Sequence, residues 1–189
     1  MRDFIFYPLC ALVVGGIIWY ALSFTPGTAP INISEGYTAS GEDLQYFLVP
    51  NQLEFTLKKD EQIGQTVAVL TSNANKASVP PSAGICMRLG PDFEAAFEGK
   101  ELEMTVRARV GDTSPTPRFQ MGYFVVGTEG SGWKEFTPTD QYADYKIRLK
   151  KTAAQGKTRG DYAGIWPDID GKGRTLNVAS ITVKLAPQN

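Results

Sequence analysis

The alternation of apolar and polar residues from Glu101 to Val110 constrains the fold of this chain more than any other feature. In the segment ELEMTVRARV the apolar residues occupy every second position, and this period of two predicts a β-strand with one buried face. The segment DYKIRLK at 144–150 repeats the pattern. The core residues predicted from these two segments are Leu102, Met104, Val106, Tyr145, Ile147 and Leu149.

Short apolar segments separated by turn residues continue through most of the chain. PDFEAAFEGK, with Phe93 and Phe97 four residues apart, is the one segment beyond residue 30 that predicts a helical turn. Many short strands without a long amphipathic helix indicate an antiparallel β-sandwich. The further strands are predicted at 31–38, 44–49, 52–57, 65–71, 83–89, 118–127, 161–166 and 175–185.

The N-terminal segment from Phe4 to Phe24, FIFYPLCALVVGGIIWYALSF, contains no charged residue. A membrane span needs about 20 apolar residues in a helix, so residues 1–24 are predicted to be a transmembrane anchor. A cleaved secretory signal peptide is the alternative, although its apolar region is usually about 7 to 15 residues and the following TPGTAP is a poor cleavage site. Gly15 and Gly16 are the positions at which a neighbouring membrane helix could pack closely.

Charge around this segment predicts its orientation. Arg2 precedes the span and no Lys or Arg follows it until Lys58, which favours a cytoplasmic N-terminus. The expected location is the bacterial inner membrane, crossed once, with the domain of residues 31–189 in the periplasm. The linker at 25–30 contains two prolines and, at about 3.1 Å per residue, reaches only about 20 Å. The domain is therefore expected close to the membrane.

Composition excludes several functions. The chain has no histidine, which removes Ser-His-Asp and Cys-His nucleophile systems and most zinc sites. With a net charge of -1 the chain has no global field that would attract nucleic acid, so no nucleic-acid partner is expected. Carboxylates are plentiful, but abundance alone does not make the spaced pair of a glycosidase. We therefore predict no catalytic residue, and expect Cys86 to be a small buried apolar residue.

Three segments together resemble a known fold family. FEGKELEMTVRARV, GSGWKEFTPTDQYADYKIRL and DYAGIWPDIDGKGRTLNVASITVKL follow one another as in jelly-roll domains of the galactose-binding-like, carbohydrate-binding-module type. In that pattern a Gly-Lys turn leads into a strand, a Trp-containing strand leads to an aromatic-rich one, and a Pro-Asp…Gly-x-Gly turn precedes the last strand. The resemblance covers residues 93–184 and implies a jelly-roll β-sandwich. It implies fold more than function, because this architecture hosts lectins and protein-binding modules alike.

Domains of this type present aromatic rings to sugars. The residues that could do so here are Trp133, Trp166, Tyr123 and Tyr162, although large aromatic residues more often fill cores. Trp133 and Phe136 are three residues apart, so in a continuous strand they would point to opposite faces.

Two charged segments are candidate sites as well. Asp168 and Asp170 in DIDGKGRT could hold a structural calcium ion, but Lys172 stands where a third oxygen ligand belongs, and an Asp-Gly turn is the simpler interpretation. No other cofactor is expected. A basic strip with no acidic residue could contact anionic lipid or an acidic partner, or could protect a solvated sheet edge. The strip comprises Lys146, Arg148, Lys150, Lys151, Lys157 and Arg159.

These observations lead to three functional predictions. The first is a non-catalytic accessory or stabilising subunit of a larger integral membrane complex, respiratory, photosynthetic or transport-related, with membrane protein subunits and lipid as partners. The second is a membrane-tethered carbohydrate-binding module. The third is a carboxylate-type enzyme acting on glycosides.

Overall fold

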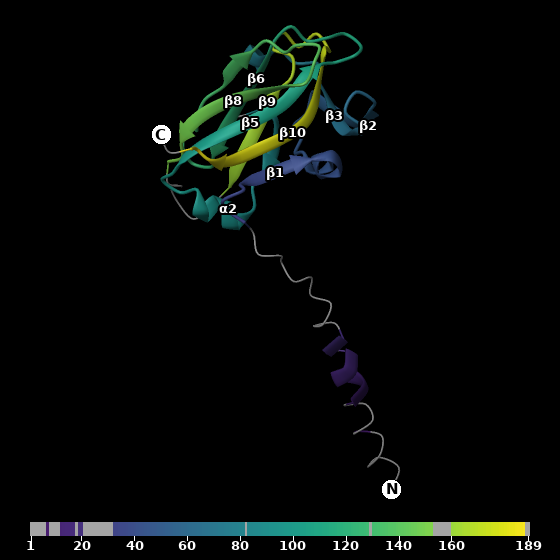
Figure 1. Ribbon diagram of the computed structural model, residues 1–189, viewed down its shortest axis with the longest axis vertical. Helices are drawn as coiled ribbons and strands as arrows, with labels where there is room; N and C mark the ends of the chain where they lie inside the picture. Colours follow the sequence, from purple (N-terminus) through teal and green to yellow (C-terminus); the bar gives the residue numbers. More distant parts are fainter. Residues whose placement is uncertain are drawn as a thin grey trace. The chain divides into compact units, whose positions relative to one another are not determined.

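The structure, a computed structural model, divides the chain into two units, residues 1–31 and residues 32–189 (Figure 1). It describes residues 7, 12–17, 19–20, 32–81, 83–128, 130–152 and 160–187. Each unit is described here by itself.

In the first unit, the described residues 12–17 and 19–20 are helical and exposed. Gly15 and Gly16 have open space where a Cβ atom would lie. The part of the chain that the structure describes contains no helix with the length and apolar character of a membrane span. Most of the remaining residues of the predicted anchor and linker lie outside the described residues, so the span stays a prediction.

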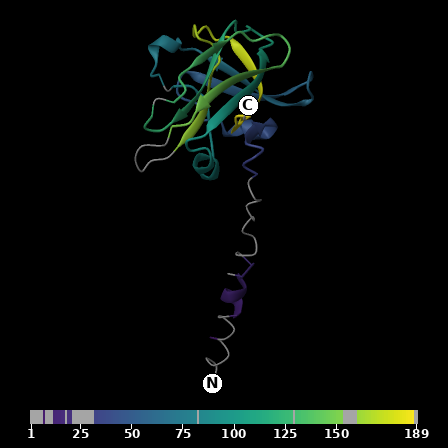
Figure 2. The ribbon, with the colours of Figure 1, turned by 60° about the vertical axis from the view of Figure 1, so that its left-hand side comes forward.

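The second unit is a sandwich of two antiparallel sheets, as the alternating pattern predicted (Figure 1 and Figure 2). The larger sheet has the strand order β2-β3-β10-β5-β8, with β1 paired to β10, and the smaller has the order β4-β9-β6-β7. The strands of the larger sheet are β1 (Tyr37–Ser40), β2 (Leu53–Asp60), β3 (Gln65–Ser72), β5 (Glu101–Val110), β8 (Ala143–Lys150) and β10 (Thr175–Leu185). Those of the smaller sheet are β4 (Ile85–Arg88), β6 (Phe119–Val125), β7 (Lys134–Phe136) and β9 (Asp161–Trp166).

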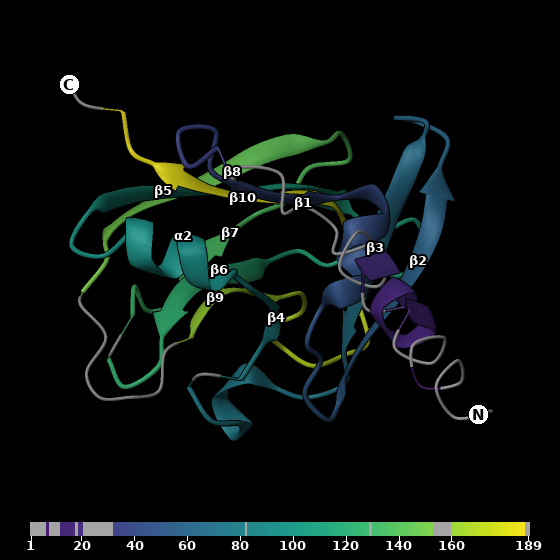
Figure 3. The same ribbon diagram turned by 90° about the horizontal axis from the view of Figure 1, so that it is seen from below.

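The core lies between the two layers, which Figure 3 shows from below. Leu102, Met104 and Val106 of β5 are fully buried, and Ile147 of β8 is 7% exposed. Tyr145 and Leu149 are partly buried and pack against the core. The predicted register of both strands is therefore confirmed, because the apolar residues of each point inward and pair with one another across the strands.

Two predicted segments differ most from the structure, and several other strands differ by one to three residues at their ends. Residues 44–49 were expected as a strand, but Gly41–Tyr46 form the 3-10 helix η1, and Leu48 makes only an isolated bridge to Cys86. The reason is that the buried residues Leu44 and Phe47 are three apart, which matches the 3-10 period rather than that of a strand. The first strand begins at Tyr37 rather than residue 31, because Asn32–Glu35 form a turn. The helical turn predicted near Phe93 is α2 (Pro91–Ala96).

A polar network ties β2 to β5 on the outer side of the larger sheet. The buried Asp60 accepts hydrogen bonds from Arg109 at 2.8 Å and from the Tyr142 hydroxyl at 2.8 Å. Arg109 also pairs with the more exposed Asp112 at 2.7 Å. Burial alone would raise the pKa of Asp60, but the hydrogen bonds from Arg109 and Tyr142 outweigh burial and lower that pKa.

Candidate functional site

The outward face of the smaller sheet carries two rows of side chains that cross β4, β9 and β6. Cross-strand pairing places Tyr162 of β9 opposite both Arg88 of β4 and Phe124 of β6, so these three residues form one row. The next outward row is Cys86, Gly164 and Gly122. Residues directly opposite on antiparallel strands have Cβ atoms about 5 Å apart, close enough to act together on one ligand.

Glycines clear the space that the aromatic rings on this face occupy. A Cβ atom on Gly84 would lie 2.5 Å from Cη2 of Trp133, and one on Gly164 would lie 3.1 Å from the same atom. A Cβ atom on Gly122 would lie 2.9 Å from the Phe124 ring. The rings of Trp133 and Phe124 therefore pack directly against glycine backbone. Larger side chains at these glycine positions would occupy the space of the rings.

Trp133 holds the loop that precedes β4 against the outward face of the smaller sheet. Its indole nitrogen donates to the Pro81 carbonyl at 2.5 Å, and its ring lies 4.8 Å from that of Phe124. Lys76 lies between two indoles, with Nζ 4.7 Å from the ring centroids of both Trp133 and Trp166. The same ammonium donates to the carbonyl of Ala83 at 3.1 Å. Trp133 is therefore a structural residue at the edge of the site.

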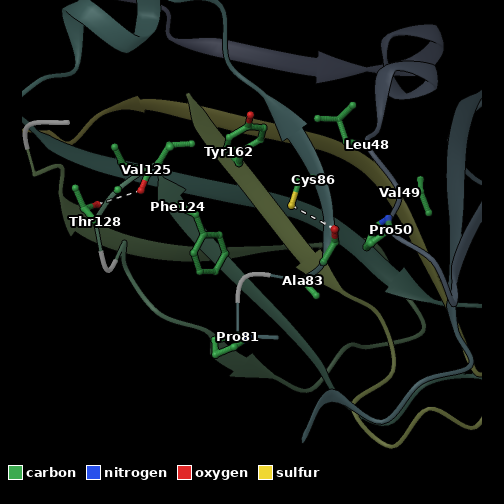
Figure 4. Close-up of a pocket in the computed structure, with 13 residues that line it drawn as sticks. Leu48, Val49, Pro50, Pro81, Ala83, Cys86, Phe124, Val125, Thr128 and Tyr162 are labelled. Atoms are coloured by element: carbon green, nitrogen blue, oxygen red, sulfur yellow. Dashed lines mark hydrogen bonds between the residues drawn. The ribbon is translucent and has the colours of Figure 1, made fainter. Parts of the chain in front are cut away.

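Beside this row lies a groove of about 890 Å³ (Figure 4). Phe124 and Tyr162 supply its aromatic surface, and none of its lining residues carries a charged side chain. Pockets for small molecules commonly combine such apolar lining with a few polar groups. The lining residues are Leu48, Val49, Pro50, Pro81, Ala83, Gly84, Cys86, Phe124, Val125, Val126, Gly127, Thr128 and Tyr162.

The thiol of Cys86 faces the groove and remains protonated under ordinary conditions. Its sulfur donates weakly to the Gly84 carbonyl at 3.4 Å. Burial raises the pKa of Cys86 to about 11, although the nearby charge of Lys76 opposes that rise. A thiol of this kind is a poor nucleophile, so it contributes shape rather than covalent chemistry to the groove. The expectation of a small buried apolar residue is close to this half-buried placement.

The four aromatic residues predicted as ligand contacts have different positions. Tyr162 lines the groove, and Trp133 is at its edge. Tyr123 is fully buried, and its hydroxyl donates to Asp161 at 2.5 Å. Trp166 is fully buried as well, and its indole nitrogen donates to the Asp168 carbonyl at 2.8 Å. Neither Tyr123 nor Trp166 can stack on a ligand without a rearrangement of its surroundings.

Phe124 is the groove residue that sequence reasoning missed. In β6 the apolar residues Phe119, Met121, Tyr123 and Val125 alternate and are buried, whereas Phe124 falls between them. This break in the alternation was a signal that Phe124 points outward, and Tyr123 inward. Trp133 lies outside the short strand β7, so the prediction for a continuous strand does not apply to it, and Phe136 packs with its ring 5.6 Å from that of Phe119.

The predicted calcium loop is held by its own hydrogen bonds. The carboxylate of Asp168 accepts backbone N–H groups of Asp170, Lys172 and Arg174 at 2.7–3.3 Å. Arg174 bonds the Asp170 carboxylate at 3.0 Å. Among the described residues, no cluster of three or more acidic or cysteine side chains could hold a metal ion. These bonds account for both acidic residues as parts of a turn, and calcium binding stays untested.

The residues of the predicted basic strip are separated in the fold. Lys146 and Arg148 on the outward face of β8 both approach Glu103, at 3.5 and 3.6 Å, and Lys150 is exposed. Lys151 is buried, and its ammonium pairs with Asp161 at 2.5 Å. Lys157 and Arg159 lie outside the described residues. The described residues of the strip therefore do not form one basic surface. Glu103 partly neutralises the cations on β8, and Lys151 is buried.

Comparisons with known proteins identify the architecture. A scan of family models finds no match for this sequence, and neither does a search of curated proteins. Solved structures do resemble it. The fold is similar to that of family 22 carbohydrate-binding modules.

Three such structures illustrate the likeness. The C-terminal family 22 carbohydrate-binding module of Clostridium thermocellum Xyn10B matches with a TM-score of 0.56 and 14% identity, over 85% of this chain and 99% of that chain. The CBM22-1 xylan-binding domain of Paenibacillus barcinonensis Xyn10C matches with a TM-score of 0.54 and 8% identity, over 81% and 95%. A putative sugar-binding protein from Bacteroides thetaiotaomicron matches with a TM-score of 0.52 and 8% identity, over 74% and 86%. At these identities the likeness concerns the fold alone, a two-sheet antiparallel β-sandwich.

Proposed function

We propose that this domain is a non-catalytic glycan-binding module whose ligand lies in the groove beside Phe124 and Tyr162. The observation that carries the proposal is the outward row on the smaller sheet, in which an exposed arginine, a tyrosine and a phenylalanine stand opposite one another next to an open, uncharged groove. Sugars present apolar C–H faces edged by hydroxyl groups. Aromatic rings suit the first and polar side chains suit the second.

The fold supports this proposal over the accessory-subunit prediction. Carbohydrate-binding modules and a putative sugar-binding protein share the architecture at TM-scores above 0.5. If residues 4–24 anchor the chain, the module would hold glycan near the membrane surface. The accessory-subunit prediction rests on that segment and on the short linker at 25–30, and stays a prediction.

Binding to a panel of soluble neutral and uronate-containing polysaccharides, measured by affinity electrophoresis, tests the proposal. We expect at least one polysaccharide to retard the protein, and Tyr162→Ala and Phe124→Ala each to weaken that binding at least about tenfold, as aromatic contacts at the centre of a site do. Thr182→Ala, on the outward face of the larger sheet, is the control and should bind normally. Retardation by no polysaccharide, or equal binding by all variants, would reject the proposal.

A further inference from the structure

Arg88 stands at one end of the aromatic row. It is the last residue of β4, and its cross-strand partner is Tyr162, which in turn faces Phe124. It lies two residues from Cys86, which lines the groove, and side chains two apart on a strand share a face. The guanidinium of Arg88 is therefore carried on the same outward face as the groove.

Arg88 forms only a weak ion pair within the domain. Its side chain is 57% exposed, and its ion pair with Glu94 joins Nε to Oε1 at 3.9 Å. That same Glu94 oxygen accepts the backbone N–H of Asp161 at 3.3 Å. No described residue pairs with the two terminal nitrogens of Arg88. Those nitrogens form a planar fork that matches the two oxygens of a carboxylate.

Among the described residues, the other cation close to the groove is already engaged, because the Lys76 ammonium donates to the Ala83 carbonyl and lies against the rings of Trp133 and Trp166. The residues that line the groove include no Asp, Glu, Lys or Arg. The buried Lys151 pairs with Asp161 and donates to the Glu94 carbonyl. Among the described residues, Arg88 thus provides an exposed and only weakly paired positive charge beside an uncharged aromatic surface.

We propose that Arg88 makes the groove selective for glycans that carry a carboxylate, that is, for uronic-acid-containing chains over neutral chains. This inference rests on the proposed glycan-binding function and adds the ligand class. In the arrangement expected, a sugar ring lies against Phe124 or Tyr162 and the carboxylate of the same or the neighbouring sugar accepts two hydrogen bonds from the Arg88 fork. Because Arg88 is exposed, the selectivity should fall as salt concentration rises.

The test uses the full-length protein and compares each uronate-containing polysaccharide of the panel with its carboxyl-reduced counterpart, which has the same backbone and linkages but no charge. The wild-type protein should bind the uronate form about tenfold more tightly, the effect of a charge-assisted hydrogen bond at an exposed site. Arg88→Gln should bind both forms equally, at the affinity of the reduced form. Arg88→Lys should recover only part of the difference, because an ammonium cannot form the paired bonds.

Arg107→Gln is the matched control, because Arg107 is an exposed arginine of the larger sheet, paired with Asp144 at 3.3 Å, and its loss changes the net charge equally. It should keep the full preference for the uronate form. Equal wild-type binding to both forms, or an equal loss in Arg88→Gln and Arg107→Gln, overturns the inference while leaving glycan binding in place. Binding to neither form of any polysaccharide overturns the proposed function and this inference together.

Discussion

Single glycines make room for the aromatic rings on the outward face of the smaller sheet. Gly84 precedes β4 and Gly164 lies in β9, and neither has a positive φ that would require glycine for its backbone. What requires glycine at these positions is the indole of Trp133, which occupies the space where their side chains would project. The glycines are therefore as much a part of the site as the rings that cover them.

We expect Gly84→Ala to displace the Trp133 indole from its position against β4 and β9. The added methyl would approach Cη2 to 2.5 Å, and because the same indole bonds the Pro81 carbonyl, the loop before β4 would have to shift with it. Overpacking of this kind costs about 1–3 kcal/mol of unfolding free energy. Denaturant unfolding and a change in tryptophan fluorescence would measure both effects. Gly90→Ser is the control, because Gly90 has open space around it and serine is a favoured helix N-cap. An equal loss of unfolding free energy in Gly84→Ala and Gly90→Ser would contradict the steric argument.

At the scale of elements, the alternating pattern predicted the long strands that have one buried face and one exposed face. Thr175–Leu185 forms β10 with the predicted bounds, and β5 and β8 differ from prediction by at most one residue. Short elements were harder to predict. The three-residue β7 is too short to show a period. At 41–46 the spacing of the buried Leu44 and Phe47, three residues apart, favoured a 3-10 helix over the predicted strand. The groove could not be predicted, because it depends on which strands of the smaller sheet become neighbours.

The network between β2 and β5 makes a prediction about stability. Asp60→Ala should cost about 3 kcal/mol at neutral pH, because it leaves the largely buried Arg109 without its buried partner. Asp112→Ala removes an exposed partner of the same arginine and should cost less than about 1 kcal/mol. Equal losses, measured by denaturant unfolding, would show that the buried pair is not the one that stabilises the sheet.

The pH dependence of the same network has a defined sign. Because the pKa of Asp60 is lowered in the folded protein, its contribution is complete above its unfolded pKa near 3.8 and is lost as the pH falls through the folded value. The wild-type protein should therefore lose more stability than Asp60→Ala as the pH falls below about 4. Parallel losses in the two proteins would contradict this assignment.

At the scale of the whole molecule, the sequence predicts that the domain is tethered to a membrane by residues 4–24. Protease added to spheroplasts should then digest the domain, and N-terminal sequencing of the intact protein should find residue 1 or 2. A mature protein that begins near residue 30 would show instead that the segment is a cleaved signal peptide. Extraction in mild detergent followed by size separation would distinguish a free module from a subunit of a complex, which is the prediction that the fold leaves open.

The pairing of β1 with β10 has a consequence for how such a domain can be used. Tyr37 lies opposite Val183, so the chain enters and leaves the sandwich on adjacent strands of the larger sheet, whereas the groove lies on the smaller sheet. Domains whose ends lie close together tolerate insertion into a host protein and circular permutation. The domain could therefore be inserted into a surface loop or fused at either end, with the groove away from the junction.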